Sequence, residues 1–263
     1  MFSYWLDLWS LTPDGAPIHT PTSDLLPVLR DGKHAMLKVA RAAEEERGHQ
    51  LMVWWNGQGA ARVLKHEGAA LLMERLGSGP SLVTLAQAGE DNQATRILCG
   101  TAARLHAPRA QPYPELVPLD HWFRALEAAA SDGGLLARSW ETAQDLLRRP
   151  QQVCPLHGDI HHGNVLRSSQ GRWLAIDPKG LIGERTFDFA NVLCNPTLDH
   201  ARRPGRLAQQ ATVLAEAARL SRRRLLQWTV AYAGLSAAWH LEDGQKQQAQ
   251  KVMELGEIAL AEL

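Results

Sequence analysis

The feature that most constrains this 263-residue chain is a polar segment enclosed by short apolar runs. Residues 156–164 read LHGDIHHGN, and Asp177 then ends the apolar run 173–176. If that run pairs antiparallel with residues 164–166, Asn164 and Asp177 come close together. We therefore expect a loop and a hairpin end to meet around Asp159, Asn164 and Asp177.

These three side chains suit one chemistry. The Asp177 carboxylate and the Asn164 amide oxygen are hard ligands of the kind that Mg²⁺ prefers when water and phosphates complete its shell. Asp159, offset from that pair, is suited to take a proton from an attacking hydroxyl group. A base beside a two-ligand magnesium site is the minimum equipment for phosphoryl transfer from a nucleotide.

Two other interpretations of the segment compete with this one. Asp and Asn are common turn residues, so each taken singly is explained by turn chemistry. His157, His161 and His162 suggest a zinc site, but Gly158 makes a helix that would align them doubtful. Hydrogen bonding within the loop explains His157 and His161 better than a metal centre does.

The rest of the chain divides into a β-rich part and a helical part. We predict a hairpin of residues 25–29 and 35–40 across the Asp31-Gly32 turn, a helix over 44–55, and short strands near 61–64 and 69–74. A Gly-Ser-Gly-Pro linker at 77–80 separates the lobes, predicted as 1–76 and 77–263. The larger lobe is predicted to contain a short β insert at 153–177 and helices over 92–106, 116–130, 135–149 and from 207 onward, with breaks near Ser221 and Gly244.

Composition excludes several classes of protein. The chain is 45% hydrophobic and 21% charged, as in globular proteins, and its 28 basic and 28 acidic residues balance, which argues against nucleic-acid binding by bulk charge. It lacks a signal-type start and an apolar run long enough to cross a membrane. The three cysteines have no metal-ligand spacing and fit free thiols in the cytoplasm. No protein or membrane partner is implied.

The order and spacing of these motifs resemble the aminoglycoside phosphotransferases. The segment 156–164, with AIDP at 175–178, is similar to the streptomycin 6-phosphotransferase and hydroxyurea phosphotransferase group of that family. MLKVA at 36–40, WWNGQGAARV at 54–63 and GLSAAW at 234–239 match the same group. The resemblance extends from about residue 25 to residue 242.

The resemblance implies an α+β, bilobal, protein-kinase-like fold, with a small antiparallel-sheet lobe and a larger, mainly helical lobe. It implies ATP and Mg²⁺ as cofactors, Asp159 as the catalytic base, and Asn164 and Asp177 as the metal ligands. Lys38 would bind the α- and β-phosphates and Glu45 would hold it by an ion pair, a partner that helical phase favours over Glu44 or Glu46. The remaining implied positions are the adenine-binding hinge near Glu74 and Leu76, and Asp188, which would brace the catalytic loop.

The sequence departs from the family pattern in three places. No Gly-x-Gly-x-x-Gly loop precedes Lys38, and the hydroxyl groups of Thr20, Thr22 and Ser23 are expected to bind phosphate instead. Gly163 stands where relatives often carry an acid. Lys179 stands where close relatives often carry histidine. Neither of the last two departures removes a core catalytic group, but either could alter the rate or the choice of substrate.

By the same resemblance, the expected reaction is phosphorylation of streptomycin at its 6-hydroxyl, which confers resistance. Streptomycin carries two guanidinium groups, so its site should offer carboxylates. Asp199, Glu242 and Asp243 are the candidates, with Trp239 as a wall of the site. The alternatives are a kinase of another small hydroxyl compound, such as hydroxyurea or a metabolite, and a non-catalytic pseudo-kinase that only binds nucleotide.

Overall fold

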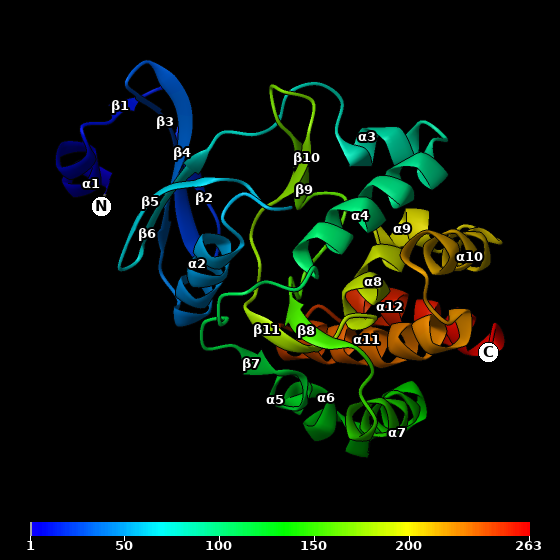
Figure 1. Ribbon diagram of the computed structural model, residues 1–263. Helices are drawn as coiled ribbons and strands as arrows, with labels where there is room; N and C mark the ends of the chain where they lie inside the picture. Colours follow the sequence, from blue (N-terminus) through cyan, green and yellow to red (C-terminus); the bar gives the residue numbers. More distant parts are fainter. Residues whose placement is uncertain (1) are drawn as a thin grey trace.

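The computed structural model describes residues 2–263 and places an antiparallel sheet beside a larger helical part (Figure 1). The six-stranded sheet has the order β1-β3-β4-β6-β5, and β2 also pairs with β3. Its strands are β1 (Thr12–Pro13), β2 (Ile18–His19), β3 (Ser23–Arg30), β4 (Lys33–Ala40), β5 (Val63–Glu67) and β6 (Ala70–Glu74). The α+β class and the antiparallel N-terminal sheet are therefore confirmed.

The predicted hairpin of β3 and β4 sets the direction of Lys38. Leu25 lies opposite Lys38 in the antiparallel register. Because side chains alternate along a strand, Leu37 and Val39 are buried in a cluster on one face of the sheet, and Lys38 faces the other. Helix α1 (Phe2–Trp9), which sequence patterning did not predict, packs against the same apolar cluster.

Helix α2 (Ala43–Trp55) matches the prediction of a helix over 44–55. It ends at Asn56, which adopts the left-handed conformation typical of helix C-termini. At Gly48 the helix touches the loop after Asp177 so closely that an added Cβ would lie 2.2 Å from the Pro178 carbonyl oxygen. The missing side chain therefore lets α2 sit directly on that loop.

The helical part is built around α11 (Arg222–Glu242), which packs against α7, α8 and α12. An all-round buried helix of this kind forms the core of a domain. The predictions over 92–106 and 135–149 and the breaks near Ser221 and Gly244 are confirmed. The other helices are α3 (Leu82–Gln87), α4 (Asp91–Leu105), α7 (Gly134–Arg148), α8 (Phe187–Leu193), α9 (Leu198–Ala201), α10 (Arg206–Ala218) and α12 (Lys246–Ala261).

The prediction of a single helix over 116–130 is wrong. The segment forms a short strand, β7 (Val117–Pro118), then α5 (Leu119–Trp122), α6 (Arg124–Ala129) and a 3₁₀ turn (Ala130–Asp132). The N–H of Val117 donates to the Gly180 carbonyl, and Pro118 has no N–H to continue a helix. Tertiary pairing therefore overrides the apolar periodicity of this segment.

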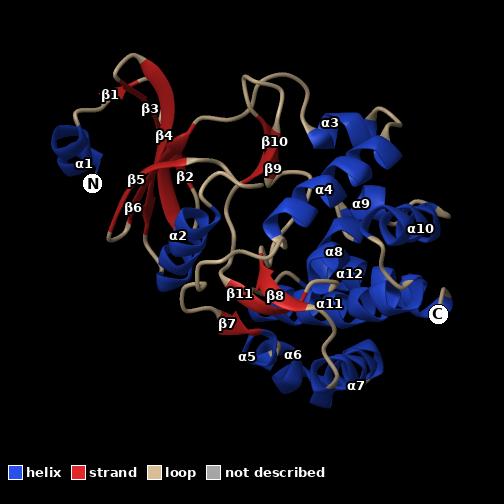
Figure 2. Cartoon of the chain, viewed as in Figure 1, coloured by secondary structure: helices blue, strands red, loops and turns tan. Residues whose placement is uncertain are grey.

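The predicted β insert at 153–177 contributes strands to two small sheets (Figure 2). β9 (Val165–Arg167) pairs antiparallel with β10 (Trp173–Ala175), as predicted, and the N–H of Ile176 donates to the Asn164 carbonyl. β11 (Leu181–Glu184) pairs with β7 and with β8 (Val153–Leu156). This arrangement brings Asn164 beside the residue that precedes Asp177.

The two parts are connected at residues 75–81. There the N–H groups of Gly77 and Ser78 donate to the Arg167 carbonyl at 2.8 and 3.0 Å. The lobe boundary at 76/77 remains a prediction. Across residues 2–263, none of the helices has both the length and the apolar character required to span a bilayer.

The three cysteines are unpaired, as predicted. Cys99 and Cys194 are buried and Cys154 is partly buried. Burial raises the pKa of each of these thiols to about 12.

Candidate active site

The loop that carries Asp159 connects β8 to β9 and is held from beneath by Asp188. The fully buried Asp188 carboxylate accepts hydrogen bonds from the N–H groups of His157 (2.9 Å) and Gly158 (2.7 Å). His106 Nε2 donates to the same carboxylate at 2.7 Å. Burial opposes the Asp188 charge, but these donors keep its pKa below the usual range. The predicted bracing role of Asp188 is therefore confirmed.

The Asp159 carboxylate is fixed by two amides. Asn164 Nδ2 donates to Asp159 Oδ2 at 3.2 Å and to its carbonyl at 2.9 Å, and Asn191 Nδ2 donates to Oδ1 at 2.8 Å. Burial raises the pKa of Asp159, against the opposing charges of His161 and Lys179. A fixed carboxylate with a raised pKa is suited to accept a proton.

Lys38 joins the sheet, α2 and the second part of the chain. Its ammonium donates to both Glu45 and Asp177. The geometry therefore selects Glu45 as the partner of Lys38, as helical phase indicates. Burial would raise the pKa of Asp177, but the Lys38 ammonium holds it below the usual value.

Asn164 and Asp177 fit a magnesium ion by the chemistry of their donors. Asn164 uses its Nδ2 group to hold Asp159, which leaves its Oδ1 as an acceptor. Asp177 Oδ1 accepts a hydrogen bond from Lys38, and the Asp177 side chain is 38% exposed. Two hard oxygen donors match the way Mg²⁺ is bound in proteins, with water and phosphates as its other ligands.

The predicted hydroxyl donors are already engaged. Thr22 Oγ1 donates to Glu45 Oε1 at 2.8 Å, so it supports the Lys38 ion pair. The hydroxyl groups of Thr20 and Ser23 lie 3.0 Å apart, and Ser23 is buried. A role for Thr22 and Ser23 in binding phosphate remains a prediction.

Two cavities flank this polar centre. The first, here called the lysine cavity, has a volume of about 190 Å³. Its lining includes Lys38, Ser23, His49, Met73 and Asp177. Glu74 and Leu76 follow Met73 but do not line this cavity; Glu74 Oε1 accepts the N–H of Arg62 at 2.8 Å. Their role at an adenine-binding hinge remains a prediction.

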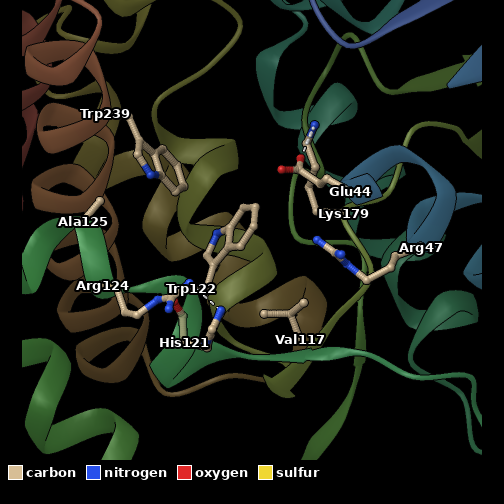
Figure 3. Close-up of a pocket in the computed structure, with 9 residues that line it drawn as sticks. All are labelled: Glu44, Arg47, Val117, His121, Trp122, Arg124, Ala125, Lys179 and Trp239. Atoms are coloured by element: carbon tan, nitrogen blue, oxygen red, sulfur yellow. Dashed lines mark hydrogen bonds and ion pairs between the residues drawn. The ribbon is translucent and has the colours of Figure 1, made fainter. Parts of the chain in front are cut away.

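The second cavity, here called the tryptophan cavity, has a volume of about 530 Å³ and lies between α2, α5, α6 and α11 (Figure 3). The rings of Trp122 and Trp239 meet edge to face in it, with centroids 5.5 Å apart. It is lined by Glu44, Arg47, Val117, His121, Trp122, Arg124, Ala125, Lys179 and Trp239. Of the four predicted substrate residues, Trp239 is therefore in a cavity wall.

The predicted substrate carboxylates lie elsewhere. Asp199 forms ion pairs with Arg202 (2.8 Å) and Lys251 (2.9 Å). Glu242 and Asp243 are exposed at the end of α11. None of the three lines either cavity, and their role in substrate binding remains a prediction.

Sequence reasoning missed the carboxylate that does line the tryptophan cavity. Glu44 Oε1 lies 3.0 Å from Lys179 Nζ. The signal was its position one residue before Glu45, which turns it toward the neighbouring loop rather than toward Lys38. Arg47 and Trp122 also line this cavity, and nothing in the sequence brings their segments together.

Two of the three loop histidines, His157 and His161, make hydrogen bonds within the protein, whereas His162 is buried with neither ring nitrogen bonded. His157 Nε2 donates to the Ile176 carbonyl at 2.8 Å, and its ring stacks on Trp55. His161 Nδ1 accepts the N–H of Gly163 at 3.0 Å. Within residues 2–263, no cluster of three His, Cys, Asp or Glu side chains is arranged to hold a metal ion.

Comparison of the structure with solved structures identifies the fold. The amicoumacin kinase hAmiN superimposes with a TM-score of 0.71 at 14% identity, over 97% of this chain and 92% of that one. The aminoglycoside phosphotransferase APH(4)-Ia, in a complex with ADP and hygromycin B, gives a TM-score of 0.68 at 12% identity, over 98% and 97%. The predicted bilobal, protein-kinase-like fold is confirmed.

Sequence comparison gives nearer relatives. A streptomycin 3''-kinase of Klebsiella pneumoniae is 46% identical over 97% of this chain and 98% of its own length. A streptomycin 6-kinase of Streptomyces glaucescens is 36% identical over 91% and 81%, and a hydroxyurea phosphotransferase of Kitasatospora aureofaciens is 32% identical over 97% and 77%. The model of the aminoglycoside/hydroxyurea antibiotic resistance kinase family matches residues 8–244. With its kinase-like fold and its grouped Lys38, Asp159, Asn164 and Asp177, this chain belongs to that family.

Proposed function

We propose that this protein transfers the γ-phosphoryl group of ATP to a hydroxyl group of streptomycin. The observation that carries the proposal is the grouping of Lys38, Asp177, Asn164 and Asp159, with Lys38 and Asp177 in the wall of the lysine cavity. Two of the relatives above are kinases of this antibiotic. The reaction needs a cytoplasmic supply of ATP, and we propose that location for the protein.

In the proposed reaction, the hydroxyl oxygen of the acceptor forms a bond to the γ-phosphorus as the bond to the β,γ-bridging oxygen breaks. The hydroxyl proton passes to Asp159, and ADP leaves. Asn164 and Asn191 hold the Asp159 carboxylate in one orientation, so it meets the hydroxyl without rearrangement. Lys38, aligned by Glu45, binds the phosphates on the nucleotide side.

Asn164 and Asp177 would hold Mg²⁺ in this reaction. The ion would supply positive charge to the phosphate oxygens. Lys38 occupies one oxygen of Asp177 and fixes the orientation of that carboxylate.

The position of the phosphorylated hydroxyl is the finer question. The sequence analysis expects the 6-hydroxyl. The relative at 46% identity is a streptomycin 3''-kinase, whereas the 6-kinase of Streptomyces glaucescens shares 36%. We therefore propose the 3''-hydroxyl as the main acceptor and the 6-hydroxyl as the second candidate.

The test is mass spectrometry of streptomycin incubated with ATP, Mg²⁺ and the protein, beside the Asp159→Asn variant. We expect a gain of about 80 Da for one phosphate, and a turnover at least about 100-fold lower in the variant. Phosphorus–proton NMR correlation of the product then assigns the 3'' or the 6 position. An unmodified drug would contradict the substrate proposal.

The same assay separates the other candidate functions. Hydroxyurea, for which a relative at 32% identity is named, and other small hydroxyl compounds serve as alternative acceptors. Turnover of one of these alone would identify a kinase of different specificity. Nucleotide binding without turnover of any acceptor would favour a pseudo-kinase, against which the retained Lys38, Asp159, Asn164 and Asp177 argue.

A further inference from the structure

Lys179 is the charged side chain that joins the tryptophan cavity to the catalytic loop. Its N–H donates to the His157 carbonyl at 2.7 Å, which fixes its backbone beside that loop. Its side chain is about one-fifth exposed, lines the tryptophan cavity, and places Nζ 3.0 Å from Glu44 Oε1 and 3.9 Å from Glu45 Oε1 (Figure 3). Lys179 and Lys38 therefore reach Glu45 from two sides, one from each cavity.

The charges around Lys179 explain why a second cation is useful there. Three carboxylates contact the two lysines: Glu44, Glu45 and Asp177. The charge of Lys179 also acts on the Asp159 carboxylate. A phosphoryl group that moves toward the acceptor carries negative charge on its oxygens and approaches the Asp159 carboxylate. Lys38 is committed to the nucleotide side, so it does not offset this repulsion on the acceptor side.

We propose that Lys179 is a catalytic cation that donates N–H groups to the oxygens of the transferring phosphoryl group from the acceptor side. The inference rests on the proposed function. An ammonium has three donors, and Glu44, its close partner, holds Nζ at the edge of the tryptophan cavity. The position follows the Asp177-Pro178 pair directly, so the Lys179 side chain leaves the backbone next to the predicted metal ligand.

A purely structural role would look different. In that case Lys179 would only tie α2 to the loop after Asp177 through Glu44, and removing either partner would have the same effect. In the proposed role, Glu44→Gln releases Lys179 and leaves its charge in place. The two variants therefore separate the two explanations.

The experiment measures kcat and KM of the full-length wild type and of K179M, K179Q, K179R and E44Q, with streptomycin and ATP-Mg²⁺. We expect K179M and K179Q to lower kcat roughly 100-fold with KM for ATP almost unchanged, as for loss of a donor used in the transition state. K179R should recover to within about tenfold of wild type in kcat. E44Q removes a carboxylate of the tryptophan cavity, so we expect a higher KM for streptomycin with a kcat within about threefold of wild type. K65M removes a lysine on β5 that lies over Trp9, away from both cavities, and serves as the matched control.

Each result has one meaning. A kcat for K179M and K179Q within about tenfold of that of E44Q overturns the proposal and assigns Lys179 a structural role, as does an inactive K179R. Thermal melts of all variants establish that the proteins compared are folded. If wild type turns over no acceptor, the proposed function fails and this inference falls with it. If wild type is active and K179M equals it, only this inference fails.

Discussion

Two buried titratable side chains, Asp188 and His49, differ in their hydrogen bonding. Asp188 is buried with three hydrogen-bond donors around it, so its charge is stable within the protein. His49 on α2 is buried as well, but neither of its ring nitrogens has a hydrogen-bond partner in the structure. Burial, with the nearby Lys38 and His66, lowers the pKa of His49 to about 3. His49 is therefore neutral in the folded protein.

The low pKa of His49 in the folded protein predicts a loss of stability in acid. The unfolded chain protonates His49 near pH 6.5, whereas the folded chain does so only near pH 3. Between these values the unfolded state binds one more proton, so the free energy of unfolding falls by up to about 1.4 kcal/mol per pH unit as pH decreases. That slope is set by the number of protons taken up on unfolding, and His49→Leu should reduce this number by about one. Urea unfolding at several pH values measures it, and equal slopes for both proteins would contradict the assignment.

At the scale of elements, the position of α2 decides whether Lys38, Glu45 and Asp177 meet. The helix touches the Pro178 carbonyl at Gly48, and its first turn carries Glu44 and Glu45 toward the two lysines. A change in the separation between this helix and the loop would therefore disturb both ion pairs together.

Gly48→Ala tests this contact. The new methyl group would lie 2.2 Å from the Pro178 oxygen, so α2 must move, and we expect a loss of about 2 kcal/mol in stability together with lower activity. Gly100→Ala in α4 is the matched control, because its Cβ would meet nothing within 4 Å. There the exchange should stabilise by up to about 1 kcal/mol. Denaturant midpoints compare the two, and similar shifts in both variants would exclude a special role for Gly48.

Sequence patterns predicted these elements where the signal is local. The β3–β4 hairpin, α2 and the β9–β10 pair depend on nearby turn residues and on periodicity. The prediction of a helix over 116–130 failed because the conformation of this segment depends on Gly180, which pairs with Val117 from a distant part of the chain. The helix over 2–9 lies beyond the reach of a local signal, since it is stabilised by packing on the sheet.

At the scale of the whole molecule, the site is assembled from both parts of the chain. The N–H of Ala61 donates to the Ala175 carbonyl, and the N–H of Ala175 donates to the Gly59 carbonyl, both at 2.8 Å. The grouping of Asp159, Asn164 and Asp177 could be predicted because their spacing is a motif. The tryptophan cavity could not, since Arg47, Trp122 and Lys179 come from segments that only the folded chain brings together.

This shared construction predicts one cooperative unfolding transition that nucleotide shifts as a unit. A non-hydrolysable ATP analogue with Mg²⁺, at about 100 times its dissociation constant, should add about 2.7 kcal/mol to the free energy of unfolding. Lys38→Met should abolish most of that gain. Differential scanning calorimetry checks both points. Two separate transitions, only one of them sensitive to nucleotide, would show that the parts unfold independently.

The burial of the three cysteines has a practical consequence. A thiol with a pKa near 12 is almost entirely protonated at neutral pH, and the protonated form reacts poorly with maleimides. Cysteines introduced on the surface would therefore react in preference to the three natural cysteines. A pair of dyes, one attached to the sheet and one to the helical part, could report the distance between the two parts without prior removal of Cys99, Cys154 or Cys194.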